Sequence, residues 1–150
     1  MTKLPNQETI DAWALLLRSQ QSVLAAVEHD LKAAGFPPLS WYDILLELKR
    51  ASPRLLTARE LEKEVLLPQY NISRLLDRLE KAGYLLREAS PDDGRANLLR
   101  MTEDGRALLK RMWPAYGVAI QRRMGDRLSS TEITSLAAVL RRLVDRKAST

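Results

Sequence analysis

The 150-residue sequence predicts a mainly α-helical fold that includes one small β-hairpin. Apolar residues recur at helical spacing in long stretches near both ends and in shorter stretches between them. Two short apolar segments instead flank SPDDG, a combination of serine, proline, aspartate and glycine that is typical of a turn. The length suits one domain, which we expect to occupy residues 1–150.

A long first helix is expected over about residues 6–35, with Asn6 as its cap. Its apolar side chains alternate at spacings of three and four, a heptad-like stripe interrupted once by glutamine: Ile10, Trp13, Leu17, Gln20, Leu24, Val27 and Leu31. A second helix should follow, where Ser40 and Asp43 have the spacing of a capping box.

Two short helices are expected in the centre of the chain. The first begins at Thr57, which has the spacing of a capping box with Glu60. Pro68 suits the first position of the second helix, because its fixed φ is helical and its missing N–H is not needed there. This helix should end at Gly83, a residue suited to a left-handed cap. Its apolar stripe consists of Ile72, Leu75, Leu76 and Leu79.

The opposite face of this second helix is polar. At about 100° per residue it carries Tyr70, Arg74, Asp77 and Lys81, flanked by Asn71, Ser73 and Arg78. Such a face is often merely solvated. Tyrosine, asparagine, serine and arginine grouped near the start of a helix can also bind base edges in a major groove of DNA.

A β-hairpin is expected from residues 84–89 and 95–101. At its tip Asp93 and Arg95 lie two residues apart, and such side chains share one face of an extended strand. The carboxylate could hold the guanidinium in one orientation, which suits a narrow, negatively charged minor groove. The alternative is an ordinary surface ion pair of small energy.

Two more helices should occupy about residues 102–147. Pro114 lies well inside the first of them, where it removes a hydrogen bond and predicts a kink. The kink could follow a subunit interface or open a cavity beside Trp113 and Tyr116. The last helix should begin with a capping box formed by Ser129 and Glu132.

The terminal helices have apolar stripes longer than the small central region can cover. They could pack on one another within one chain, or across a two-fold axis in a homodimer. The length of the stripes favours the homodimer. Two copies of the polar helix about 34 Å apart would meet successive major grooves, which predicts a pseudo-palindromic site.

Composition narrows the classes of function. Cysteine is absent, which excludes disulfides and thiolate chemistry, and the only histidine is His29. The glycines do not form a dinucleotide-binding pattern, so we expect no catalytic site, metal or cofactor. No signal peptide or membrane span is evident, and a cytoplasmic protein is expected.

Positive charge is concentrated outside the first 48 residues. Residues 1–48 contain three basic and six acidic side chains, residues 49–101 contain eleven and eight, and residues 102–150 contain ten and five. This balance is compatible with nucleic-acid binding and does not establish it.

The run from Leu56 to Leu109 resembles the winged helix-turn-helix of the MarR family of bacterial transcription regulators. The specific segments are ISRLLDRLEKAGYLLR, the wing Asp93-Gly94-Arg95, and MTEDGRALL at the start of the next helix. The resemblance covers a core of about residues 39–101 in detail. It covers the long dimerisation helices, about 6–35 and 102–147, in layout.

The resemblance implies a homodimer that binds double-stranded DNA, often a repressor that a small aromatic or phenolic ligand releases. The wing arginine corresponds to Arg95, and Leu67 departs from a serine cap common in relatives. The base-reading positions correspond to Gln69, Tyr70, Asn71, Ser73 and Arg74. Arg78 and Lys81, farther along the same face, are expected to contact phosphates.

In such regulators ligands bind between the dimerisation helices and the DNA-binding part. The residues available to line such a pocket are Trp13, Trp41, Tyr42, Trp113 and Tyr116, with Arg18 or His29 as a polar contact. Aromatic residues at helical spacing are also common in ordinary cores. A further alternative for the whole chain is a winged-helix module that binds other proteins and not DNA.

Overall fold

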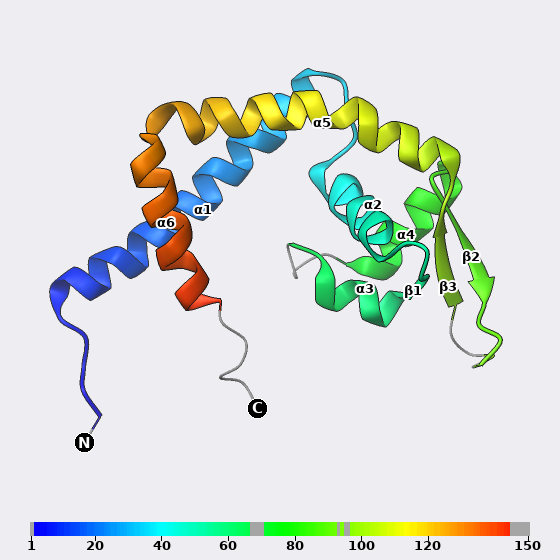
Figure 1. Ribbon diagram of the computed structural model, residues 1–150, viewed down its shortest axis with the longest axis horizontal. Coiled ribbons are helices and arrows are strands. Elements are labelled where there is room, and N and C mark those ends of the chain that lie inside the picture. Colours follow the sequence, from blue (N-terminus) through cyan, green and yellow to red (C-terminus); the bar gives the residue numbers. More distant parts are fainter. Residues whose placement is uncertain (1, 67–70, 93, 95–96, 145–150) are drawn as a thin grey trace. The chain divides into compact units, whose positions relative to one another are not determined.

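The computed structural model describes residues 2–66, 71–92, 94 and 97–144 (Figure 1). They form two compact units, one of Asp30–Tyr116 and the other of Met1–His29 with Gly117–Thr150. Both boundaries fall inside helices, since α1 spans Gln7–Ala33 and α5 spans Glu103–Arg123.

The unit Asp30–Tyr116 contains a three-stranded antiparallel sheet with order β1-β3-β2. The strands β2 (Leu85–Ala89) and β3 (Asn97–Met101) form the expected hairpin, in which Leu85 pairs with Met101 and Ala89 with Asn97. The strand β1 (Leu56–Thr57) pairs with β3 on its other side and was not predicted. Two residues are too few to show an alternating pattern.

Three helices pack against this sheet and against one another: α2 (Leu39–Ala51), α3 (Ala58–Glu64) and α4 (Ile72–Lys81). Figure 1 shows them beside the strands. The apolar face of each is buried, and the largest fully buried side chains of this unit are Leu31, Ile44, Leu45, Leu56, Leu61, Leu76, Leu79, Leu85, Leu99, Leu108 and Met112. This core holds α3 and α4 as a helix-turn-helix.

The end of α4 is bonded to the start of α5. Gly83 ends α4 with φ +86°, and the next N–H, that of Tyr84, donates to Leu79 O at 2.9 Å, as in a Schellman cap. The Thr102 hydroxyl donates to Gly83 O at 2.7 Å and accepts from the Gly105 N–H at 3.1 Å. Thr102 therefore caps α5 and bonds it to the turn that follows α4.

Several predicted helix ends are confirmed. Thr57 with Glu60 and Ser129 with Glu132 form complete capping boxes, and the Asn6 side chain accepts from a backbone N–H in the first turn of α1. The last helix, α6, spans Ser130–Leu143, so the stretch expected to continue to 147 extends beyond the described residues.

Two predicted helix starts are wrong. The helix α2 begins directly after Pro38 without a side-chain cap, so Ser40 and Asp43 do not form a capping box. The helix α4 does not run continuously from Pro68, because Asn71 has an extended backbone (φ −78°, ψ 92°) and precedes the first helical residue. Pro114 lies within α5, and the kink expected there stays a prediction.

The unit of Met1–His29 with Gly117–Thr150 exposes much apolar surface. It contains the first part of α1, the last part of α5, the short 3₁₀ helix η1 (Gly125–Arg127) and α6. No residue of α6 is buried. In α1, Val27 near the C-terminal end of the helix is buried. Large exposed apolar side chains are Leu4, Ile10, Trp13, Leu15, Leu17, Val118, Ile120, Val139, Leu143 and Val144. Among the described residues, no helix combines the length and apolar character needed to cross a bilayer.

Candidate nucleic-acid interface

The helix α4 has one buried and one exposed face, as its sequence predicts. Ile72, Leu76 and Leu79 are buried, and Leu75 is half-buried. The exposed side chains are Ser73, Arg74, Asp77, Arg78 and Lys81. Within the described part of the chain, Arg74, Arg78 and Lys81 form no ion pair with a carboxylate. Their charges are therefore available to an external anion.

Asn71 caps the N-terminal end of α4. Its side-chain oxygen accepts from the Arg74 N–H at 3.2 Å, which satisfies one of the N–H groups that a helix start leaves without an internal partner. This bond holds the Asn71 side chain at the start of α4, where the residue is exposed and its amide NH₂ can donate to another molecule. Gln69 and Tyr70, the other two predicted base-reading positions near this end, lie outside the described residues.

Arg87 joins α4 to the hairpin. The Arg87 guanidinium on β2 donates to the Asp77 carboxylate at 2.7 Å and lies 3.9 Å from Glu80. The Arg87 backbone N–H also donates to Glu80 at 3.2 Å. The polar face predicted from helical spacing includes Asp77. Its partner lies ten residues away on another element, so no local pattern could indicate the pair.

The hairpin carries a second ion pair of its own. The Arg100 guanidinium donates to both oxygens of Glu88, at 2.6 and 3.3 Å, and this bond lowers the pKa of the Glu88 carboxyl from its ordinary value. Toward the tip, Asp92 and Gly94 are exposed. Asp93 and Arg95, the predicted wing pair, lie outside the described residues.

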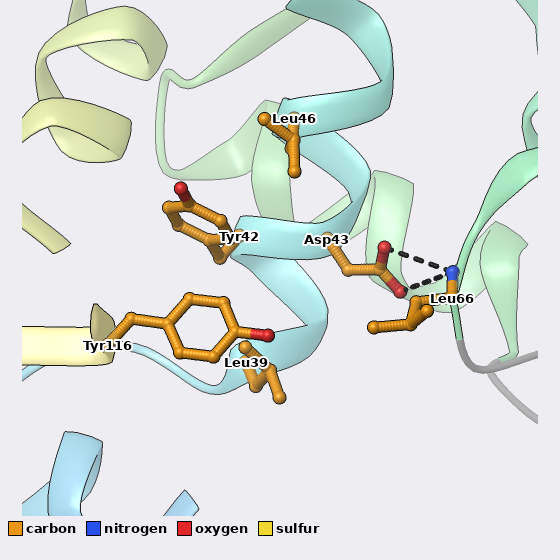
Figure 2. A pocket seen from close by; sticks show the side chains of 6 residues that line it. All are labelled: Leu39, Tyr42, Asp43, Leu46, Leu66 and Tyr116. Carbon is orange, nitrogen blue, oxygen red and sulfur yellow. Dashed lines mark hydrogen bonds between the residues drawn. The ribbon is translucent and has the colours of Figure 1, made fainter. Parts of the chain in front are cut away.

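Two of the five predicted pocket aromatics line one cavity. Tyr42 of α2 and Tyr116 of α5 meet edge to face with ring centroids 5.0 Å apart (Figure 2). Burial raises the pKa of both phenols, and for Tyr116 the nearby Asp43 charge raises it further. Both phenols therefore stay protonated at neutral pH. The cavity is lined by Leu39, Tyr42, Asp43, Leu46, Leu66 and Tyr116.

The other three predicted pocket aromatics are not among the lining residues. Trp41 packs edge to face on Tyr84, with ring centroids 5.8 Å apart. Trp113 is exposed beside Tyr116, and Trp13 belongs to the other unit. The cavity measures about 30 Å³, whereas ligand pockets are typically at least about 300 Å³. In this conformation it has room for water and not for an aromatic ring.

Asp43 is a buried charged residue that contacts the turn of the helix-turn-helix. Its side chain projects from α2, and both carboxylate oxygens accept from the Leu66 backbone N–H, at 3.0 and 2.9 Å (Figure 2). Leu66 lies between the end of α3 and the start of α4. The local spacing of Asp43 predicts a helix cap and gives no sign of this contact, which spans 23 residues.

This is a winged helix-turn-helix protein, because it combines a helix-turn-helix, a three-stranded sheet with a hairpin wing, and an exposed basic face on the second helix.

The MarR family model matches residues 34–96. The chain is 40% identical over 107 residues to an HTH-type transcriptional regulator of Bacillus cereus, an alignment that covers 68% of this chain and 65% of that protein. The chain thus spans slightly less than two thirds of that relative.

Solved structures share the fold along nearly the whole chain. Sco3205, a MarR family transcriptional regulator from Streptomyces coelicolor solved in complex with DNA, has a TM-score of 0.82 and 24% identity, with coverage of 95% of this chain and 89% of that one. BpsR of Bordetella bronchiseptica, whose DNA binding is regulated by 6-hydroxynicotinic acid, has a TM-score of 0.79 and 22% identity, with coverage of 95% and 99%.

This protein belongs to the MarR family of transcription regulators. The resemblance inferred from the sequence and the predicted winged helix-turn-helix fold are therefore confirmed. The prediction that the protein is not an enzyme is also confirmed, because the named relatives are regulators of transcription.

Proposed function

We propose that this regulator is a repressor that binds a pseudo-palindromic operator as a homodimer, with α4 in the major groove. The observation that carries the proposal is the exposed basic face of α4. Three cations, Arg74, Arg78 and Lys81, lie on it without an ion-pair partner among the described residues. The buried stripe on the opposite side holds the helix to the core, so the basic face remains available to DNA.

The residues of α4 take different roles in this proposal. Ser73, Arg74 and the amide of Asn71 lie at the N-terminal end, the part of a recognition helix that contacts base edges. Gln69 and Tyr70 join them by family resemblance. Arg78 and Lys81 lie farther along and contact phosphates, which positions the helix without reading sequence. The wing residues Asp93 and Arg95 lie outside the described residues, and Arg95 joins the proposal as a minor-groove contact by family resemblance.

The homodimer is supported by the exposed apolar side chains of the unit Met1–His29 with Gly117–Thr150. A single copy leaves Trp13 on α1 and Val139 and Leu143 on α6 in water. Where exposed apolar side chains of this size form a continuous surface, they usually mark an interface. Sedimentation equilibrium should therefore give twice the chain mass for the wild type. Leu143→Asp should shift the protein toward monomer, while the same change at Thr131, exposed on the same helix, should not.

The proposal includes a small aromatic ligand as the signal that releases the protein from DNA. BpsR, a regulator of the same fold, responds to an aromatic acid. In the present chain Tyr42 and Tyr116 offer protonated phenols. Because the cavity beside the tyrosines is small, a ligand would have to open it. Aromatic carboxylates and phenols should displace the protein from its operator, and no displacement across both classes would contradict this part.

The central test is selection of bound sequences from random duplex DNA, followed by affinity measurements at several salt concentrations. We expect an enriched pseudo-palindrome with half-sites one helical turn apart. The logarithm of the affinity should fall with the logarithm of salt by about 0.9 per phosphate contact. Absence of enrichment together with salt-independent binding to another protein would favour the alternative, a protein-interaction module.

A further inference from the structure

We propose that Asp43 is a positioning residue for DNA recognition: its buried carboxylate holds the turn that leads into α4 and so sets where the N-terminal end of α4 lies. This inference rests on the proposed DNA-binding function. It adds a residue from outside the helix-turn-helix to the residues that determine sequence preference.

The geometry of the contact is that of a carboxylate holding a backbone group. Both oxygens of Asp43 accept from the Leu66 N–H, at 3.0 and 2.9 Å. The helix α3 ends just before this point, since the Val65 N–H still donates to Leu61 O while the next N–H donates to Asp43. The carboxylate therefore satisfies the first backbone donor beyond α3.

Packing of the buried Val65 side chain holds the chain just before this point, and the hydrogen bond to Asp43 holds Leu66 itself. The Leu66 side chain is 69% exposed and contributes little burial there. Asp43 is only 6% exposed, and a buried carboxylate is costly unless it is well bonded. Its neighbours on α2, Ile44 and Leu45, are completely buried, so Asp43 projects from a helix fixed in the core.

The consequence for DNA follows from the short distance along the chain between the turn and the reading end of α4. Leu66 lies five residues before Asn71, which caps the helix, and eight before Arg74. Hydrogen bonds to base edges require close positional matching, whereas salt-dependent phosphate contacts tolerate small shifts. Loss of the Asp43 bond should therefore reduce sequence preference more than affinity for random DNA.

The test compares Asp43→Ala, Asp43→Asn and the control Glu47→Gln. Glu47 lies one turn later on α2 and is mostly buried, yet its ion pair is with Arg50 and not with the turn. Asparagine keeps an oxygen that can accept from the Leu66 N–H, while alanine does not. For each variant we would measure the affinity for the selected operator and for a random duplex, the midpoint of thermal unfolding, and hydrogen exchange of the Leu66 amide.

We expect Asp43→Ala to lose about tenfold or more in the ratio of operator to random affinity, comparable to one good base contact. Its affinity for random DNA should change less than about twofold. Asp43→Asn should recover part of the ratio, and Glu47→Gln should match the wild type. Hydrogen exchange of the Leu66 amide should be slowest in the wild type, faster in Asp43→Asn and fastest in Asp43→Ala.

The opposite results would overturn the inference. A folded Asp43→Ala protein with an unchanged affinity ratio would contradict it, as would equal losses on both DNAs. If the alanine variant does not fold, Asp43→Asn decides: faster Leu66 exchange with an unchanged ratio also contradicts the inference. If wild-type protein shows no sequence preference, the proposed function fails, and Leu66 exchange still decides whether Asp43 holds the turn.

Discussion

Replacing Arg87 by methionine should weaken DNA binding although Arg87 is not itself placed in a groove. The change keeps most of the apolar stem of the side chain and removes its contact with Asp77, at 2.7 Å. Asp77 is then left as an unpaired negative charge on the polar face of α4. That face is the one expected to approach phosphates.

The magnitude follows from the exposure of the two partners. The Arg87 side chain is 26% exposed and that of Asp77 is 68% exposed, so solvent screens the pair and its contribution to stability is about 0.5–1 kcal/mol. For a chain of this size that corresponds to a fall of about 1–4 °C in the unfolding midpoint. An unpaired charge about 8 Å from a phosphate in water is repelled by about 0.5 kcal/mol. One or two such phosphates would weaken binding by about two- to fivefold at low salt.

The assay is fluorescence anisotropy with a labelled operator at low and high salt, applied to a double-mutant cycle. Arg87→Met should bind more weakly, and Arg87→Met with Asp77→Asn should recover the lost affinity because the unpaired charge is gone. Arg54→Met is the matched control, since it removes an arginine from an ion pair with Glu60 that does not involve α4. Wild-type affinity for Arg87→Met, or no recovery in the double variant, would refute the reasoning.

The remaining predictions concern the DNA contacts and acid stability. Arg74→Ala should reduce the preference for operator over random DNA, whereas Arg78→Ala should weaken both about equally; equal losses for Arg74 would assign it to phosphate. Arg95→Ala should cost about 1–3 kcal/mol of operator affinity and leave the dimer intact, and operator binding like that of wild type would refute the wing argument. The pKa of Glu60 is lowered, first by its bond from the Thr57 N–H and then by Arg54. While the Glu60 carboxyl titrates, the folded state therefore binds fewer protons than the unfolded state. The Glu60 carboxylate contributes to stability above the ordinary glutamate pKa of about 4.3, and this contribution is lost as the pH falls through the lowered pKa. In urea unfolding, Glu60→Ala should thus be less stable than wild type at pH 7 by more than at pH 3, and a difference that grew toward low pH would contradict the sign.

Features that depend on neighbours a few residues apart could be predicted from the sequence. The two capping boxes, the left-handed Gly83 and the buried stripe of α4 each involve partners within one or two helical turns. At that range the spacing of residue types determines the geometry, whatever the rest of the chain does. The polar outer face of α4, and with it most of the described candidate interface, follows from the same periodicity.

The tertiary structure decided which polar residues hold the interface in place. Asp43 has the local spacing of a cap, yet a proline-led helix start leaves its carboxylate to bond the Leu66 N–H 23 residues away. Asp77 belongs to a polar helix face, yet it pairs with Arg87 across the unit. The two-residue strand β1 exists only because β3 offers an edge for it. Local periodicity specifies which face of a helix meets water, but contacts between distant segments depend on how the core packs, which no short stretch of sequence contains.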